Sequence, residues 1–245
     1  MWSSRSGHAQ ASHRQRPVPR KRHVVRWLNC ELDGIVQPVQ TVPASSASAQ
    51  RRLEVHRAVR ELLSEQGFRM SMDAVAARAG CSKQTLYAHF GSKQELMRSV
   101  MQEYLDMATA RLDDGVDDPR TALLGFALEH LERLSDPLVA STRQLLGDEA
   151  TQFPEEARAL YRGGCETLHQ RLAEWLARAM RRGQLRHDDP HYAAELLMGM
   201  IVGLDLERRR FAMPSRDTDA LRDRWAGFAV DAFLRAFAPT PATAP

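Results

Sequence analysis

Residues 71–96 read SMDAVAARAGCSKQTLYAHFGSKQEL, and this stretch decides what the N-terminal part of the chain can fold into. Ser71 and Ser82 each precede a short segment with helical spacing, and serine is a favoured N-cap because its hydroxyl accepts an orphan backbone N–H. Gly80 lies between the two segments, where a tight turn needs a left-handed residue. The side chains expected to face inward are Val75, Ala76, Ala79 and Leu86. The stretch therefore predicts a helix-turn-helix whose second helix spans Lys83–Phe90.

The outward side of this second helix is polar and contains no acidic residue. A helix that enters the major groove needs such a side, because the base edges there are rich in hydrogen-bond acceptors. Gln84 is expected to pair with adenine, Lys83 with guanine or a phosphate, and Thr85 with a base edge, a thymine methyl or a phosphate. Tyr87 and His89 lie one turn along and suit phosphate oxygens better than bases.

The run Ser92-Lys93-Gln94-Glu95 is a capping box, which predicts a long helix from here to about Leu112. Lys93 stands in the first turn of that helix, where its positive charge opposes the helix dipole. An anion nearby would make this placement favourable, and a DNA phosphate fits that role.

These residues carry a specific family resemblance. The run Thr85-Leu86-Tyr87-x-His89-Phe90-x-Ser92-Lys93-x-x-Leu96 strongly resembles the DNA-binding domain of TetR-family transcriptional regulators, over about residues 48–110. The resemblance implies that Gln84, Thr85, Tyr87, His89 and Lys93 face DNA, and we add Ser71 and Lys83 to this predicted DNA-binding set. Cys81 stands where the family usually has an apolar valine, and we favour core packing for it over redox sensing.

The segment before this motif predicts one more helix and a leader. Apolar residues from Leu53 to Leu63 recur at helical spacing, which indicates a helix over residues 48–66 that stops at Gly67. Residues 1–47 show no sustained hydrophobic period and are expected to be a disordered basic leader. The alternative is a basic arm that adds sequence-independent affinity for DNA phosphates.

The rest of the chain predicts helices only. Asp118-Pro119, Asp136-Pro137 and Asp189-Pro190 each place a capping aspartate before a proline at the first helical position, and Phe153-Pro154 is a further start. The matching stops are expected at Gly115, Gly147 and Gly183, with single helices over 189–210 and 217–237. No segment alternates like a half-buried strand, so the fold class is all-α. The predicted organisation is an N-terminal three-helix helix-turn-helix domain (48–110), a C-terminal helical bundle for ligand binding and dimerisation (111–238), and a disordered tail (239–245).

The bundle shows a second, less specific resemblance. Arg182-Gly183-Gln184-Leu185-Arg186, with Asp189-Pro190 and Gly199 beyond it, is similar to the AefR-like type of regulatory C-terminal domain. The resemblance implies a homodimer built from the last two helices and a small-molecule pocket within each protomer. The predicted pocket residues are Met107, Phe126, His130, Tyr161, Cys165, His169 and Trp175, although residues at such spacing also fill ordinary cores.

The helix expected over 189–210 carries apolar residues on more than one side, which is typical of a helix buried on several sides. The helix expected over 217–237 carries one apolar stripe, made of Leu221, Trp225, Phe228, Ala232 and Phe233. These are the last two helices. They could form an isologous four-helix seam between two protomers, or simply fill the monomer core. The residues predicted at the dimer interface are Leu196, Met200, Leu204, Trp225, Phe228 and Phe233.

Other chemistries find little support in the sequence. Cys165 and His169, and likewise His187 and His191, stand four residues apart as metal ligands on one helix face do, but no third and fourth ligand converge on either pair. The chain has no G-x-S-x-G, P-loop, G-x-G-x-x-G or H-E-x-x-H motif, so neither catalysis nor a cofactor or metal is expected. Asp113-Asp114 and Asp188-Asp189 lie at expected helix boundaries, where capping explains them.

Charge and cysteine usage agree with a DNA-binding protein of the cytoplasm. The formal net charge is +3, with the basic excess in residues 1–110 and an acidic excess beyond. Three scattered cysteines do not make a disulfide framework, and no apolar run is long enough to span a membrane. We expect a homodimeric repressor that a small apolar effector releases from a palindromic operator in double-stranded DNA. The alternatives are an effector-independent activator or adaptor, and an enzyme-like bundle with a vestigial DNA-binding domain.

Overall fold

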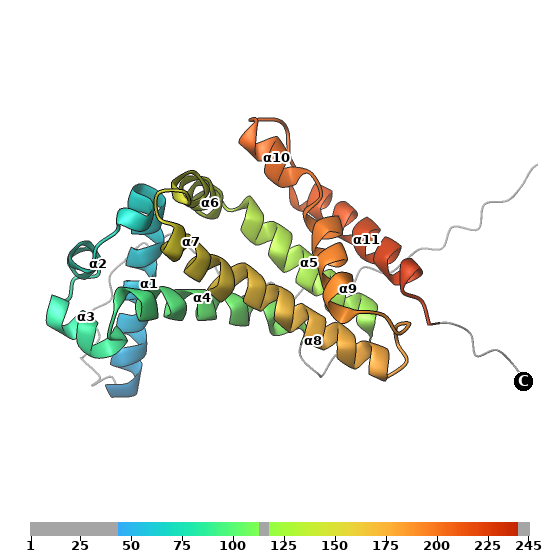
Figure 1. The fold of residues 1–245 in the computed structure, drawn as a ribbon, viewed down its shortest axis with the longest axis horizontal. Helices are drawn as coiled ribbons and strands as arrows, with labels where there is room; N and C mark the ends of the chain where they lie inside the picture. The colour runs from blue at the N-terminus through green and yellow to red at the C-terminus, as the bar shows by residue number, and fades with distance from the viewer. Residues whose placement is uncertain (1–43, 113–117, 240–245) are drawn as a thin grey trace, which may run out of the picture. The chain divides into compact units, whose positions relative to one another are not determined.

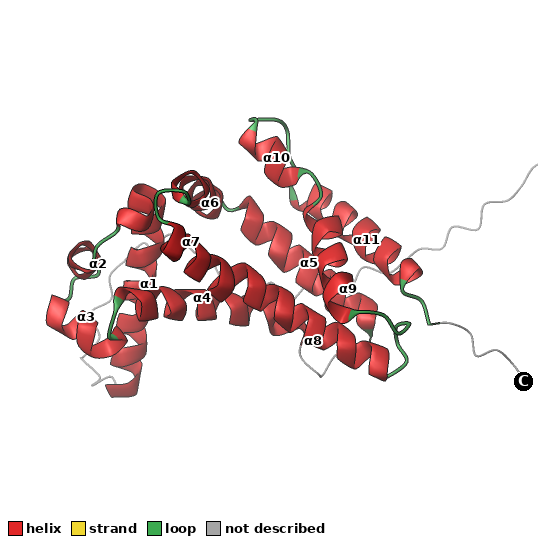
Figure 2. Cartoon of the chain, viewed as in Figure 1, coloured by secondary structure: helices red, strands yellow, loops and turns green. Residues whose placement is uncertain are grey.

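The structure, a computed structural model, describes residues 44–112 and 118–239. Within these two ranges the chain forms helices joined by turns, without a strand (Figure 2). The prediction of an all-α fold is confirmed. The predicted leader up to residue 43, Cys30, the Asp113-Asp114 pair, the predicted stop at Gly115 and the tail from residue 240 lie outside the described residues.

The N-terminal helices begin where the serine caps predict. Ser71, Ser82 and Ser92 each accept a hydrogen bond from the backbone N–H three residues ahead, at 3.0–3.1 Å. The first helix begins at Ala44, earlier than the predicted residue 48, because the Ala/Ser run before it continues the helix. The elements are α1 (Ala44–Gln66), the 3₁₀ turn η1 (Gly67–Arg69), α2 (Met72–Arg78), α3 (Lys83–Phe90), α4 (Lys93–Thr109) and the 3₁₀ turn η2 (Ala110–Leu112).

The C-terminal helices confirm the three aspartate caps. Asp118, Asp136 and Asp189 each accept backbone N–H groups of the first turn that follows, and a proline occupies the first helical position each time. The elements are α5 (Pro119–Ser135), α6 (Pro137–Glu149), α7 (Pro154–Tyr161), the π-helical turn η3 (Arg162–Glu166), α8 (Thr167–Arg181), α9 (Pro190–Val202), α10 (Asp205–Arg210) and α11 (Asp219–Ala236).

The prediction of one helix over 189–210 is wrong. Helix α9 ends before Gly203, whose φ of +54° is left-handed, and α10 starts two residues later. The indole of Trp225 lies only 3.0 Å from where a Cβ of Gly203 would stand, so the chain passes too close for a side chain. The buried Asp205 at the restart forms ion pairs with Arg216 at 2.6 Å and Arg208 at 3.3 Å. Tertiary contacts therefore override the helical pattern here.

The predicted stop at Gly147 is also wrong, whereas the stop at Gly183 is confirmed. Helix α6 continues through Gly147 to Glu149, whose buried side chain is held by the backbone of η1. Gly183 has a φ of +71° and ends α8. Between α7 and α8 the π-helical turn η3 was not predicted, because an apolar period does not reveal one inserted residue.

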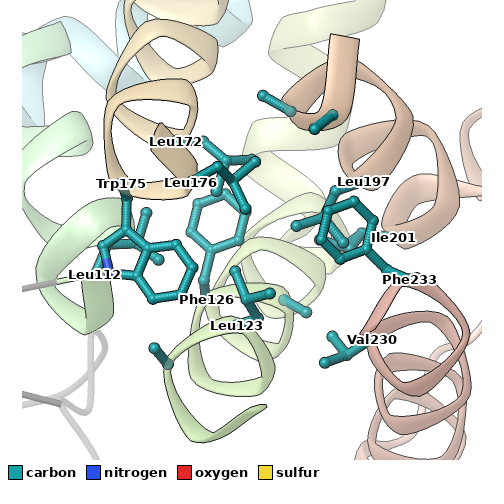
Figure 3. Packing of buried hydrophobic residues seen from close by; sticks show 14 of the residues in the cluster. Leu112, Leu123, Phe126, Leu172, Trp175, Leu176, Leu197, Ile201, Val230 and Phe233 are labelled. Atoms are coloured by element: carbon teal, nitrogen blue, oxygen red, sulfur yellow. The ribbon is translucent and has the colours of Figure 1, made fainter. Parts of the chain in front are cut away.

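Two apolar clusters hold the described chain together. The first joins α1 to α4 around Val59, Leu62 and Leu96. The second combines residues of α5, α8, α9 and α11 with residues of α4 and η2. Figure 3 shows Leu172 and Leu176 against Phe126, and Leu197 and Ile201 beside Phe233.

Helix α4 belongs to both parts, because it packs on α1 and α3 at one end and on α5 and α8 further along (Figure 1). Helix α6 also reaches both parts, since it packs on α1 and η1 as well as on α5. These two helices therefore connect the helix-turn-helix to the bundle.

Candidate nucleic-acid interface

The turn between α2 and α3 has the geometry that the motif requires. Gly80 has a φ of +65°, and the backbone N–H of Cys81 returns to the carbonyl of Ala76 at 3.0 Å. Val75 and Leu86 are buried between the helices, as predicted. This packing holds α3 by one side and leaves its other side in solvent.

The predicted outward face of α3 is exposed. Lys83, Gln84, Tyr87, Ala88 and His89 are exposed in the described chain, and Thr85 is half-buried with its hydroxyl 2.8 Å from that of Ser82. The helix carries no acidic side chain. This face can therefore enter a groove lined by acceptors and phosphates without charge repulsion.

Lys83 has an intramolecular partner in the DNA-free protein. Its ammonium lies 2.8 Å from a carboxylate oxygen of Asp73 on α2, and this hydrogen bond raises the pKa of Lys83 above its usual range. Lys83 therefore keeps its charge at neutral pH, and DNA has to compete with Asp73 for it. Ser71 at the start of α2 is exposed, with its hydroxyl engaged as the N-cap.

Lys93 also has a partner that the sequence does not reveal. Its ammonium donates to the backbone carbonyl of Phe68 in η1 at 2.7 Å, and partial burial lowers the pKa of Lys93. The carbonyl supplies negative charge near the start of α4, where an anion was expected. Two ammonium hydrogens remain available for a phosphate, because an ammonium has three donors.

Sequence reasoning missed the contribution of α1 to this face. A cavity of about 90 Å³ between α1 and α3 is lined by Arg51 and Arg52 together with Thr85, His89 and Cys81. Arg52 donates to Ser99 of α4 at 2.9 Å. Cys81 is half-buried and packs against the N-terminal cluster. The pair of arginines in α1 could have been noticed, but nothing in the sequence places α1 beside α3.

The predicted pocket residues of the bundle do not form one group. Phe126, His130 and Trp175 are buried, Met107 and His169 are half-buried, and Tyr161 and Cys165 are exposed. Phe126 and His130 stack with ring centroids 6.0 Å apart.

His169 instead contacts α9. Its Nε2 lies 2.9 Å from the carbonyl of His191, and the two rings lie 5.7 Å apart. Among the residues that the structure describes, no group of three potential ligands could hold a metal ion.

Most residues predicted at the dimer interface lie on the surface. Leu196, Leu204 and Phe228 are exposed, and Met200 and Trp225 are half-buried. Phe233 is 0% exposed within the protomer core, so it cannot face a partner directly. Leu221, from the predicted stripe of the last helix, is exposed as well, and the structure adds three exposed apolar side chains that the sequence pattern did not single out: Tyr192, Phe211 and Met213.

Family profiles match both parts of the chain. One profile, described as bacterial regulatory proteins of the tetR family, matches residues 57–100, and another, described as the AefR-like transcriptional repressor C-terminal domain, matches residues 121–239. The regulator AlkX of Mycobacterium tuberculosis is 36% identical over 113 residues, which cover 43% of this chain and 54% of AlkX. The regulator YezE of Bacillus subtilis is 25% identical over 177 residues, which cover 70% of this chain and 90% of YezE.

Solved structures agree with the sequence comparison. A TetR-family transcriptional regulator from Mesorhizobium loti superposes with a TM-score of 0.62 at 27% identity, covering 78% of this chain and 98% of the other. A protein described as the flavonoid-responsive regulator FrrA gives a TM-score of 0.58 at 29% identity, covering 80% and 100%. No helix in the described ranges has the length and apolar character to cross a membrane. The profile matches and the similar sequences and structures show that the chain belongs to the TetR family of transcriptional regulators, and that it is a DNA-binding regulator of transcription rather than an enzyme.

Proposed function

We propose that this protein is a homodimeric repressor that reads a palindromic operator with α3 and leaves it when a small molecule binds the bundle. The exposed, acid-free face of α3 carries the proposal, because base readout needs polar side chains that can reach the floor of a major groove. Gln84 and Thr85 contact base edges, and Ser71, Lys83, Tyr87, His89 and Lys93 hold the backbone. The protein acts in the cytoplasm, where a one-component regulator meets the chromosome.

Exposed apolar side chains on α9 and α11 support the dimer. Tyr192, Leu196 and Met200 line a shallow hollow on α9, and Phe228 of α11 is 61% exposed. Large apolar side chains gathered on two neighbouring helices are typical of a protein interface. A two-fold axis between such faces presents two copies of α3, and two copies read an inverted repeat.

The match of the C-terminal bundle bears on whether the protein represses or activates transcription. The profile that matches residues 121–239 is described as belonging to a transcriptional repressor, which supports repression. A relative named as the transcriptional activator FasR, of Mycolicibacterium smegmatis, is 41% identical over 58 residues, or 23% of this chain and 26% of FasR. An activator or adaptor that needs no effector is therefore the second candidate.

Release by an effector needs a physical connection between the C-terminal bundle and the helix-turn-helix, and α6 provides one. Glu149 in its last turn accepts a hydrogen bond from the N–H of Phe68 at 2.9 Å and forms an ion pair with Arg69. Arg69 also donates to Gln152 at 2.9 Å and lies over the ring of Phe153. An apolar or amphipathic effector that shifts α6 thus moves η1, which leads into α2. The loss of operator affinity cannot exceed the difference in the effector's affinity for the two states.

A reporter assay tests the proposal after operator fragments are selected from genomic DNA with the purified protein. Repression predicts that the wild type lowers expression from the selected promoter and that the double variant Gln84→Ala, Thr85→Ala restores it. A promoter whose expression falls when the double variant replaces the wild type would favour the activator. Arg158→Gln, an exposed change on α7, is the matched control for expression level.

A further inference from the structure

A cluster of polar side chains lies where α4, α5 and α6 meet, and two of its buried atoms lack partners. His130 and Arg133 project from the same side of α5, since they are three residues apart. Nδ1 of His130 and Nε of Arg133 are buried and have no hydrogen-bond partner within the described chain. The His130 side chain is almost wholly enclosed, with 5% of the residue exposed.

Neighbouring groups contact these side chains without giving either of the two atoms a hydrogen-bond partner. The Arg133 guanidinium lies 4.4 Å from the ring centroid of Tyr104 on α4, and the His130 ring stacks on Phe126. Such ring contacts orient the side chains but use no N–H donor. A buried N–H without an acceptor costs on the order of 1–3 kcal/mol, so it calls for an occupant.

The occupant should be an anion. Arg143 of α6 acts electrostatically on both Tyr104 and His130, so its positive charge adds to that of Arg133 near the cluster. Burial, with help from Arg143 and Arg133, lowers the pKa of His130 to about 4. His130 is therefore neutral at pH 7, and the tautomer with its proton on Nδ1 donates to an acceptor.

The acidic groups nearby give no hydrogen-bond acceptor to the two buried atoms. The other charged residues that act on Arg133 are Glu129, Arg60 and Asp136. Asp136 caps α6 with its carboxylate, and Arg60 of α1 lies 3.3 Å from Glu103 of α4. None of these acids supplies an acceptor to the two orphaned atoms.

The cluster has an apolar side and a charged side chain at the surface. The ring of Phe126 lines the cluster from the bundle core, and Arg143 is exposed to solvent on α6. The π-helical turn η3 lies across α4, where Gly164 is so close to Met101 that a Cβ would stand 3.2 Å from its sulfur. Such single π-helical turns are frequent at functional sites.

We propose that this cluster binds the carboxylate of a small amphipathic effector, with Arg133 and His130 donating to its oxygens and Arg143 closing over it. The inference rests on the proposed function, because it names the chemical class of the effector that the bundle recognises. It also supplies a path to the DNA-binding part. Arg143 lies in α6, the same helix as Glu149, whose carboxylate holds η1. An anion that attracts Arg143 therefore pulls on the helix that contacts η1.

Matched acid and amide probes test this inference on the free protein by titration calorimetry. The pairs are benzoate with benzamide, 2-naphthoate with 2-naphthamide, and hexanoate with hexanamide. We expect at least one acid to bind with its amide about tenfold weaker or more, since the amide lacks the charge that Arg133 and Arg143 attract. Arg133→Gln should weaken binding of the acid by at least about tenfold, and so should Arg143→Gln, which changes an exposed side chain. Arg158→Gln, exposed on α7, should leave it unchanged.

Three results would overturn the inference: no acid of the set binds, each amide binds as tightly as its acid, or both arginine variants bind like the wild type. An ordered water at the two orphaned atoms gives the first of these results. Operator binding by the wild type, measured in the same buffer without probes, reports on the proposed function separately. A protein that binds its operator but no acid refutes the inference alone.

Discussion

The contact of Glu149 with η1 leads to a prediction whose size follows from the structure. Glu149 is 4% exposed, and its carboxylate accepts the buried N–H of Phe68 at 2.9 Å. Glu149→Ala leaves that N–H without an acceptor, which costs about 1–3 kcal/mol. The lost ion pair with Arg69, whose side chain is 57% exposed, adds less than about 1 kcal/mol because water screens it. We therefore expect the free energy of unfolding to fall by about 2–3 kcal/mol.

Thermal unfolding followed by circular dichroism measures this loss. At roughly 2–4 °C per kcal/mol for a chain of this size, Glu149→Ala should lower the unfolding midpoint by about 5–10 °C. Glu149→Gln should lose about half as much, because its amide oxygen can still accept from Phe68. Asp148→Ala, at the exposed neighbouring position of α6, is the matched control and should shift the midpoint by about 1–2 °C at most.

DNA binding provides the second readout of the same variants. Without its anchor, η1 holds α2 and α3 less firmly, so Glu149→Ala should weaken operator binding. The slope of log affinity against log salt should stay unchanged, because Glu149 contacts no phosphate. If Glu149→Ala is as stable as Asp148→Ala and binds the operator like the wild type, the reasoning about this contact is refuted.

Three further predictions concern Lys93, His130 and the proposed dimer surface. Lys93→Ala should lower the free energy of unfolding, because the Phe68 carbonyl loses its donor. It should also reduce the slope of log DNA affinity against log salt concentration by about one unit, and an unchanged slope would show that Lys93 contacts no phosphate. Burial lowers the pKa of His130 from its ordinary value of 6.5 to about 4 in the folded protein. The unfolded chain therefore binds the proton more readily, so the free energy of unfolding should fall as the pH falls from about 6.5 to about 4. His130→Leu should flatten that dependence in denaturant titrations, leaving a part from His56, whose pKa burial also lowers. Phe228→Glu should convert the dimer to monomer in sedimentation velocity, whereas an unchanged sedimentation coefficient would exclude α11 from the interface.

The sequence was sufficient to predict the starts of the helices with a serine or aspartate cap, and the exposed face of α3. Serine and aspartate caps act through the nearest turn of backbone, so Ser82 and Asp136 identify their helices without any tertiary information. The exposure of Gln84 was predictable for a similar reason, because apolar residues on one side of a short helix leave the other side outward.

The features that the sequence did not reveal depend on contacts between distant segments. The break at Gly203 arises from the approach of Trp225, and helical spacing continues on both sides of it. The burial of Glu149 depends on η1 lying against α6, some 80 residues apart in sequence. The cluster around Arg133 combines side chains of three helices, and no local pattern brings them together.

Selection from a fully randomised duplex library tests most directly the claim that α3 reads bases, twice per dimer. The account predicts that the wild type enriches an inverted repeat, and that Gln84→Ala or Thr85→Ala relaxes the preference at matching positions in both half-sites by about 1–3 kcal/mol. Enrichment of no repeated sequence, or the same sequence preference in the wild type and both variants, would contradict it.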